Sequence, residues 1–433
     1  MYYKYKLGNG LEIIAEDVPA VRSVAFGIWI RGGSRTERRA EQGIAHFIEH
    51  MMFRGTARRT GAQIAEELDE IGGQINAFTS KEHTCYYTVT LDEHLDTAMD
   101  VLADMFFNSR LDDEDIAKEK AIVLEEIDMC EDTPDDLVYE HLQQSVWAGS
   151  PLAHPILGFK ETVCAFGRTA LEAYISRCYR AEDVVISIAG NLGDISKLFA
   201  KVEMLFSDFG SMPRFAGEDS AVSPIGSKST LYTPSIYMCI KPIEQLHILL
   251  GFPGFSESAN ERYTLAVLNT VLGSGMSSVL FQKVREELGL AYSIYSHSSG
   301  FSDTGLLYIY AGTSPENSPQ ALRAIIEQTG RIHNLSCECL QRAKKQIKSN
   351  LLLSLESTQS RMFSIGRSQL SLGDAAHTSE IFSAIDAVSI ESLNDVAARV
   401  LNLSEMSLAT VGPASKEQAK ELEAIVNGYG LAS

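Results

Sequence analysis

Residues 46–50 read His-Phe-Ile-Glu-His, and this motif constrains the chain more than any other feature of its sequence. On a helix, His46 and His50 project from one face about one turn apart, so both imidazoles can reach a single metal ion. Glu49 borders the same face and is placed to act on a water molecule at that ion. One further protein ligand would leave a coordination position open for this water, as catalytic zinc requires. The motif therefore predicts a zinc hydrolase with the order HxxEH rather than HExxH.

The segment around the motif is typical of a buried helix. Residues 43–53 read GIAHFIEHMMF, with glycine only at the start and no proline. Buried histidine and glutamate side chains need polar partners, and a metal ion would supply one. The alternative is that His46 and His50 are ordinary surface histidines or hydrogen-bonded core histidines, since the chain contains ten histidines in all.

The net charge limits the partners that the chain can bind. Lys and Arg number 37 against 57 Asp and Glu, which gives a formal net charge of −20. This charge disfavours nucleic acid and anionic membranes as partners, and it permits attraction of basic substrates. At 433 residues, 45% of them hydrophobic, the chain is long enough for a folded protein of two or more domains.

The cysteines and the N-terminus predict a cytoplasmic protein. The seven cysteines are odd in number and scattered, which favours free thiols in a reducing compartment over disulfides. The first residues, MYYKYKLGNGLEII, contain no apolar signal core, and no apolar run is long enough to span a bilayer. We therefore expect no membrane insertion and no export through a signal peptide.

Alternating patterns and turn residues predict the order of elements in the first half of the chain. We expect a hairpin over 2–16, a strand over 24–30, a helix over 61–71, strands over 74–90 with a bend at 80–82, helices over 91–146 with an interruption at 132–134, and a strand over 184–189.

Three short segments of the first half recur later in the chain, in the same order and at nearly one offset. The segments 24–28, 70–73 and 187–190 resemble 246–250, 287–290 and 409–412. Between the two sets, residues 211–235 are rich in Ser, Pro and Gly with little periodicity, which is typical of a linker. We infer a duplicated α+β unit, each copy a mostly antiparallel sheet packed by helices, with domains over 1–210 and 236–433.

The duplication tests the histidine motif. At the same offset, the three polar residues of the motif fall on apolar ones, Leu268, Val271 and Leu272. If the fold required the histidines, their counterparts in the second copy should have stayed polar. We infer that one half carries the chemistry and that the other supports it.

A third ligand is expected on the predicted helix that ends near residue 131. On a helical wheel, Glu119 lies about 20° from Glu126, and both fall among apolar residues such as Ile122. A carboxylate on a buried face needs a cation or hydrogen-bond donors. Glu126 is therefore the candidate ligand, and Glu119, two turns earlier, is a candidate for orienting a ligand. Exposed glutamates on an acidic helix explain the same pattern equally well.

At this point the chain resembles the inverted-motif zinc peptidases, a family that includes pitrilysin, insulin-degrading enzyme and the mitochondrial processing peptidase. The HxxEH motif, followed by a glutamate in the context Val-Leu-Glu-Glu-Ile, carries the resemblance together with the segment NAFTSKEHTCYY. The spacing from His50 selects Glu126 as the third ligand. The resemblance implies one Zn²⁺ per chain and a fold in which the two repeats form half of a clam-shell.

The resemblance also assigns substrate-binding residues. Asn76 and Ala77 would hold the substrate backbone by strand addition. Arg285 and Tyr292, in the segment VREELGLAYS, match an Arg/Tyr pair that the half without the metal supplies to the substrate. The chain length resembles short bacterial members close to the processing peptidases, which tend to pair as homodimers or as heterodimers with a homologous chain.

The implied reaction is hydrolysis of peptides or unfolded polypeptide segments inside a chamber. His46, His50 and Glu126 hold the zinc, and Glu49 takes the proton of the attacking water and later gives it to the leaving amine. Two alternatives stay open. The chain could be a non-catalytic partner or scaffold subunit, as occurs in this family, or a peptidase that acts only with a partner chain, including a dedicated maturase.

Overall fold

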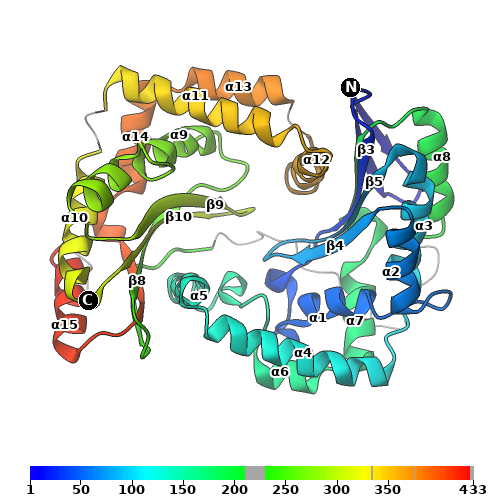
Figure 1. Ribbon diagram of the computed structural model, residues 1–433, viewed down its shortest axis with the longest axis horizontal. Helices are drawn as coiled ribbons and strands as arrows, with labels where there is room; N and C mark the ends of the chain where they lie inside the picture. Colours follow the sequence, from blue (N-terminus) through cyan, green and yellow to red (C-terminus); the bar gives the residue numbers. More distant parts are fainter. Residues whose placement is uncertain (210–229, 333–334, 376, 430–433) are drawn as a thin grey trace. The chain divides into compact units, whose positions relative to one another are not determined.

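The computed structural model describes residues 1–209, 230–332, 335–375 and 377–429, so most of the predicted linker over 211–235 lies outside the described residues. The chain forms two compact units (Figure 1). The first contains Met1–Asp128, His154–Ile225 and Leu352–Ala376, and the second contains Met129–Ala153, Gly226–Leu351 and His377–Ser433. The predicted domains 1–210 and 236–433 describe the sequence repeats, whereas the compact units are interleaved along the chain.

The first unit is built on a six-stranded sheet in the order β1-β2-β6-β3-β5-β4. Its strands are β1 (Tyr2–Lys6), β2 (Glu12–Asp17), β3 (Ser23–Ile30), β4 (Gln74–Thr79), β5 (Thr84–Leu91) and β6 (Val184–Gly190). All neighbouring strands are antiparallel except β2 and β6, which are parallel. The predicted hairpin over 2–16, the strand over 24–30 and the paired strands over 74–90 are confirmed.

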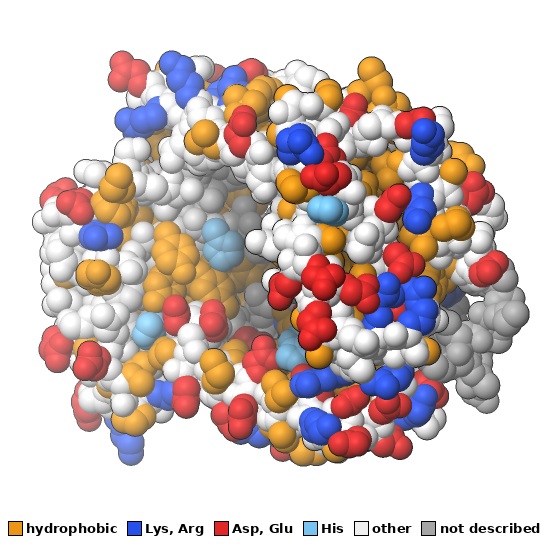
Figure 2. Space-filling view, turned by 45° about the vertical axis from the view of Figure 1, so that its right-hand side comes forward, with side chains coloured by type: hydrophobic (Ala, Val, Ile, Leu, Met, Phe, Trp, Pro, Cys, Tyr) orange, Lys and Arg blue, Asp and Glu red, His pale blue; other side chains and the backbone are white. Residues whose placement is uncertain are grey.

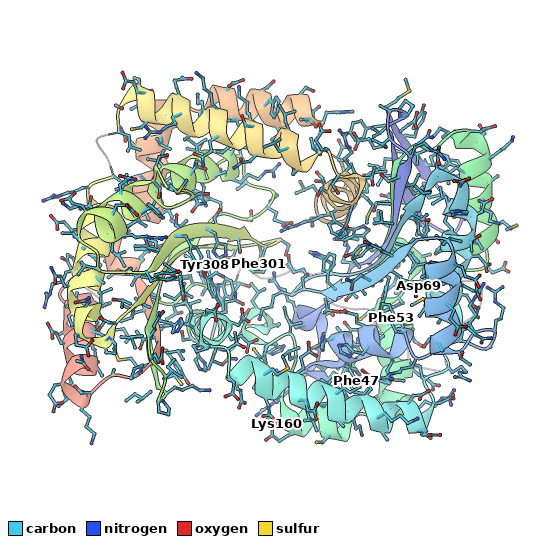
Figure 3. All side chains as sticks on the ribbon, in the orientation of Figure 1. Phe47, Phe53, Asp69, Lys160, Phe301 and Tyr308 are labelled. Atoms are coloured by element: carbon cyan, nitrogen blue, oxygen red, sulfur yellow. The ribbon has the colours of Figure 1, made fainter. Side chains whose placement is uncertain are left out.

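Helices cover both faces of this sheet. They are α1 (Ile44–Met52), α2 (Gly61–Glu70), α3 (Leu95–Asn108), most of α4 (Asp113–Glu131), α6 (Lys160–Ala165), α7 (Arg168–Cys178), α8 (Ile195–Phe206) and α12 (Thr358–Leu372). The main core lies between the sheet and α1, α3, α7 and α8. Phe47 of α1 is completely buried in it (Figure 3). On the other face, Met362 and Ile365 of α12 pack against Trp29 of β3.

The second unit repeats this sheet without the first strand. Its strands are β7 (Ile236–Ile240), β8 (Leu246–Gly254), β9 (Ser293–Gly300), β10 (Gly305–Thr313) and β11 (Ser407–Gly412), in the order β7-β11-β8-β10-β9. As in the first sheet, one pair is parallel, here β7 with β11, and the others are antiparallel. Strand for strand, this is the order β2-β6-β3-β5-β4, so the predicted duplication is confirmed.

The helices of the second unit also occupy both faces of its sheet. They are α5 (Pro134–Val146), α9 (Arg262–Leu272), a π-helix over Phe281–Glu287, α10 (Ser318–Gly330), most of α11 (Cys337–Ser354), α13 (Thr378–Ala387), α14 (Ile390–Val400) and α15 (Lys416–Asn427). Helix α5 packs with Tyr308 of β10 and Phe301 at the end of β9 (Figure 3). The predicted helix interruption at 132–134 is the gap between α4 and α5.

Each sheet is thus covered on one face by a helix from the other half of the sequence. Helix α5 comes from the first repeat and packs on β8 and β11, whereas α12 comes from the second repeat and packs on β2, β3 and β6. A glycine in the central strand makes room in both cases. A Cβ at Gly27 would lie 2.5 Å from Met362 Sδ, and one at Gly251 would lie 2.8 Å from Leu142 Cδ2.

The surface carries both signs of charge. Acidic and basic side chains lie close to one another on the face that Figure 2 shows. None of the seven cysteines, all of which are described, forms a disulfide in the structure. Within the described residues, no helix combines the length and the apolar character that crossing a membrane demands.

Candidate metal centre

Three predicted ligands meet in the first unit. The Nε2 atoms of His46 and His50 each lie 3.6 Å from Glu126 Oε2. One ligand atom from each of the three side chains lies within 4.8 Å of the other two, and no other such group occurs in the part of the chain that the structure describes. The two imidazole centroids are 4.5 Å apart, as one helical turn requires.

Helix α1, which carries both histidines, has a tightly fixed start. Gly43 precedes it with φ of 93°, and a Cβ there would lie 2.5 Å from Leu157 O. The carboxylate of Glu37 accepts hydrogen bonds from Gly43 N at 2.8 Å and Ala45 N at 2.9 Å. Glu37 therefore satisfies two amide groups that the helix itself leaves without partners.

The polar atoms at this site fit a zinc ion. Glu126 Oε2 is buried, and no donor among the described residues reaches it. His46 is 7% exposed, and burial, with the neighbouring His50, lowers the pKa of His46 to about 3, which keeps its imidazole in the neutral form that binds a metal. Two imidazole nitrogens and one carboxylate oxygen form the ligand set of an open catalytic zinc site.

Glu119 binds the ring nitrogen of His50 that lies away from Glu126. His50 Nδ1 donates to Glu119 Oε1 at 2.8 Å, which leaves Nε2 facing Glu126, and Arg54 donates to the second oxygen of Glu119. Burial opposes the charge on both groups. The mutual hydrogen bond nevertheless raises the pKa of His50, and this bond together with Arg54 lowers the pKa of Glu119. Glu119 thus fixes the orientation of the His50 imidazole, which is the arrangement that a metal-binding histidine commonly has.

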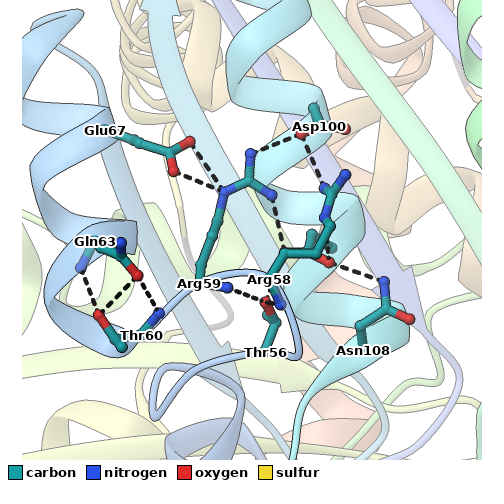
Figure 4. A network of polar contacts seen from close by, with 9 residues as sticks. Thr56, Arg58, Arg59, Thr60, Gln63, Glu67, Asp100 and Asn108 are labelled. Carbon is teal, nitrogen blue, oxygen red and sulfur yellow. Dashed lines mark hydrogen bonds and ion pairs between the residues drawn. The ribbon is translucent and has the colours of Figure 1, made fainter.

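The loop after α1 presents Arg54 and is itself anchored by a polar network (Figure 4). The buried carboxylate of Asp104 on α3 accepts from Thr56 Oγ1 at 2.7 Å and from Arg59 at 2.9 Å. Arg59 also binds Asp100 and Glu67. Because three carboxylates hold one guanidinium, the loop has a defined path between α1 and α2.

Glu49 is bound by a residue that the sequence did not single out. Thr79 Oγ1, at the end of β4, donates to Glu49 Oε2 at 2.5 Å. Burial raises the pKa of Glu49 above its ordinary value, although the Thr79 hydrogen bond opposes this shift. A carboxylate with a raised pKa beside a metal site is suited to general-base work near neutral pH.

The helical wheel for α4 is correct for Glu119 and Glu125, but it places Glu126 and Ile122 too close to the buried face. Glu119 is 2% exposed, and Glu125 is exposed, as expected. Ile122, however, is 42% exposed, because the buried stripe runs through Ile116, Glu119, Val123 and Ile127. Glu126 therefore lies at the border of the buried face rather than at its centre.

The predicted substrate residues of the first unit lie on the edge strand of its sheet. Asn76 and Ala77 belong to β4, which among the described residues pairs with β5 alone. Ala77 N donates to Asn76 Oδ1 at 2.8 Å, and Ala77 packs against the core that contains α1.

Arg285 and Tyr292 belong to the second unit, where the structure brings them together. The guanidinium carbon of Arg285 lies 5.6 Å from the ring centre of Tyr292 and 4.8 Å from that of Phe281. Arg285 sits on the π-helix, and Tyr292 is 75% exposed. Short π-helices often mark functional positions.

Three residues of the site were not predicted from sequence. Thr79 could have been found, because period-two alternation places it on the same face of its strand as Ala77. Arg54 lies on the loop that follows the motif, where no pattern indicates its partner. Glu37 lies in the charged stretch RTERRAEQ, which is typical of an exposed loop, so nothing indicates that its carboxylate is buried.

Similarity to known proteins extends over nearly the whole chain. The pattern of the insulinase family, peptidase family M16, matches residues 12–160, and that of the M16 inactive domain matches residues 165–347. The chain is 42% identical to the zinc protease YmxG of Bacillus subtilis, over 95% of this chain and 98% of that one. It is 36% identical to a zinc protease of Streptomyces coelicolor, over 96% and 90% respectively.

Solved structures share the fold. A protease from Helicobacter pylori superposes with a TM-score of 0.86 at 18% identity, covering 95% of this chain and 99% of that one. A structure from Pseudomonas fluorescens, described as a peptidase M16 inactive domain, gives the same TM-score and identity over 96% and 98%. The two family patterns together match most of residues 12–347, and relatives above 30% identity cover almost all of the chain. The chain belongs to the insulinase family, peptidase family M16.

Proposed function

We propose that this chain is a zinc endopeptidase that hydrolyses peptides or unfolded polypeptide segments, with one Zn²⁺ held by His46, His50 and Glu126. One observation carries the proposal: two imidazole nitrogens of one helix face a buried carboxylate oxygen that has no hydrogen-bond donor among the described residues. The names of the relatives, which are zinc proteases, support the same reaction class.

In this proposal each residue around the site has a separate role in hydrolysis. Zinc, when bound, lowers the pKa of a water ligand to about 7 and polarises the scissile carbonyl. Glu49 takes the proton from the attacking water and returns it to the leaving amine. Glu119 keeps the Nδ1 proton of His50 directed away from the metal, so that Nε2 stays available as a ligand.

The substrate is held as an added strand. The free edge of β4 offers backbone groups to an extended peptide, with Asn76 and Ala77 on the strand that would be extended. Because α1 packs against β4, a peptide added there would run past the motif. Arg285 and Tyr292 of the second unit act on the substrate as a pair, in a chamber completed by a second copy or a homologous chain. The seven cysteines, which form no disulfide, support a cytoplasmic location.

The test is a direct measurement of zinc and hydrolysis on the purified chain. We expect about one zinc per chain by metal analysis, and cleavage of an unfolded peptide library detected by mass spectrometry. Glu49→Gln should keep the zinc and lose cleavage by about 10²-fold or more. Glu125→Gln, on the exposed face of α4, is the matched control and should retain both.

A wild-type chain without zinc at neutral pH, or a fully active Glu49→Gln variant, would refute the proposal. A chain that binds zinc but cleaves peptides only after a homologous chain is added would show that activity requires a partner. A chain that stays inactive in both cases would be a non-catalytic subunit.

A further inference from the structure

The general base needs a fixed orientation, and the structure contains a candidate for providing it. Thr79 Oγ1 lies 2.5 Å from Glu49 Oε2. We propose that Thr79 is a positioning residue that holds the Glu49 carboxylate with one oxygen occupied and the other directed to the attacking water. This inference rests on the proposed peptidase function, because it assigns a role to Glu49 in that reaction.

Accounting for the hydroxyl protons supports the direction of this hydrogen bond. Thr84, opposite Thr79 on β5, donates its hydroxyl proton to Gly32 O at 2.9 Å. Thr84 therefore has no proton left for Thr79, whose oxygen lies 3.5 Å away. The single proton of Thr79 goes to Glu49, since a carboxylate is the stronger acceptor and lies closer.

Thr79 is itself held firmly by the turn that joins β4 to β5. Ser80 N donates to His83 O at 2.8 Å, and Ser34 N donates to Ser80 O at 3.2 Å. A Cβ at Gly33 would lie only 2.1 Å from Ser80 O, so the two segments are in close backbone contact. Lys81 Nζ ties the same turn to His154 O at 2.5 Å.

A fixed carboxylate matters because the base must face the water before the proton is transferred. A free glutamate samples several rotamers, and each misdirected rotamer lowers the fraction of productive complexes. With Oε2 engaged by Thr79, Oε1 is the oxygen that accepts the proton. Thr79 touches neither the metal nor the substrate in this scheme and acts only through Glu49.

The decisive variants are Thr79→Val, which keeps the shape and removes the hydroxyl, and Thr79→Ser, which restores the hydroxyl. Thr90→Val is the matched control, because Thr90 lies on β5 and its buried hydroxyl has no hydrogen-bond partner among the described residues. We expect Thr79→Val to lower kcat by about 10- to 100-fold, as for loss of a hydrogen bond to a charged group. KM and zinc content should be unchanged, and Thr79→Ser should recover most of kcat.

A readout that is independent of activity uses the metal-free protein. Urea unfolding midpoints are measured for Thr79→Val, Glu49→Ala, and the double variant. We expect Thr79→Val to lower the midpoint in the wild-type background and to have little effect once Glu49 is replaced. Additive shifts would show that the hydrogen bond is not made and would overturn the proposal.

Three further results would also overturn it. The first is a kcat of Thr79→Val within twofold of the wild-type kcat, and the second is a kcat of Thr79→Ser no higher than that of Thr79→Val. The third is a loss of zinc from Thr79→Val while the control Thr90→Val keeps its zinc. If the zinc-loaded wild type cleaves no peptide even after a homologous chain is added, the proposed function fails and the positioning role fails with it. An active wild type with an unaffected Thr79→Val variant refutes only the role of Thr79.

Discussion

Helix α1 of the first unit and helix α9 of the second differ in the residues that they bury. Each follows the central strand of its sheet, β3 or β8, and each packs into the main core of its unit. Helix α1 brings two histidines and a glutamate to its inner face, whereas α9 brings Leu268, Val271 and Leu272, all buried. The same fold thus forms around either set, so the fold itself does not require the polar residues of α1.

The largest expected effect comes from giving α1 the apolar character of α9. His46→Leu should abolish zinc binding and lower hydrolysis by about 10³-fold or more. The metal-free protein should be as stable as wild type or slightly more so, because the variant removes a buried Nδ1 that has no partner among the described residues. Metal analysis, peptide assays and urea unfolding check this, and a large loss of stability in the metal-free variant would show that the fold requires the histidine.

Giving α9 a polar residue of α1 should lower the stability of the protein. Leu268→His places an imidazole in a position of α9 that is 0% exposed and surrounded by apolar residues. We expect the free energy of unfolding to fall by about 3 kcal/mol, since the buried polar ring gains no partner. Urea unfolding measures this, with Leu268→Met as the control. A Leu268→His variant as stable as Leu268→Met would remove the distinction between the two helices.

The two helices also differ at their N-termini, because Glu37 caps α1, whereas α9 has no side-chain cap at its N-cap residue Glu261. We therefore expect Glu37 to make the stability of the first unit depend on pH. Burial raises the pKa of Glu37 from 4.5 to about 8, more than its two backbone donors lower it. The folded state therefore holds this proton more tightly than the unfolded chain. Its contribution is complete below pH 4.5 and is lost as the pH rises toward about 8.

We expect wild-type stability to decline by about 2 kcal/mol more than that of Glu37→Gln between pH 5 and 8. The measurement is urea unfolding at several pH values, and the slope rather than the absolute stability is compared, because glutamine can accept from only one of the two amides. Glu66→Gln, on the exposed side of α2, is the control. Parallel curves for wild type and Glu37→Gln would contradict the prediction.

The smallest effect concerns a feature that the two units share. Gly27 of β3 pairs with Ser187 and Tyr87, and Gly251 of β8 pairs with Ser407 and Tyr308. Alanine at either position meets the end of a flexible side chain from the covering helix, so Gly27→Ala and Gly251→Ala should each cost about 1 kcal/mol. Thermal unfolding compares the two variants, and a cost at only one position would show that the helices approach the sheets differently.

Much of the fold follows from local sequence patterns. Strand β3 is a continuous apolar run, the hairpin of β4 and β5 alternates around a polar turn, and α1 is apolar with no proline. These patterns depend only on residues that are near in sequence, so they can be recognised without knowledge of the rest of the chain. The covering helices were not predicted in their places, because an apolar stripe shows that a helix is buried without showing which sheet it covers.

The residues of the candidate site also fall into those that local sequence indicates and those that it does not. His46, Glu49 and His50 are close in sequence and could be recognised directly, whereas Glu126 needed the helical wheel and the family spacing together. Glu119 was expected to orient a ligand, and the structure shows that His50 is its partner. Glu37 and Arg54 escaped prediction, since a charged residue in a polar stretch looks the same whether it is solvated or buried against a helix end.

The sequence by itself determined the position of the motif, the duplication, and the contrast between a polar helix in one half and an apolar helix in the other. Only the tertiary structure decided which distant groups complete the site: the Thr79 hydroxyl on Glu49, the Glu37 cap on α1, and the exchange of α5 and α12 between the sheets. The physical reason is that helical and strand periodicity are set by neighbours along the chain. Hydrogen bonds across elements, in contrast, depend on how those elements pack.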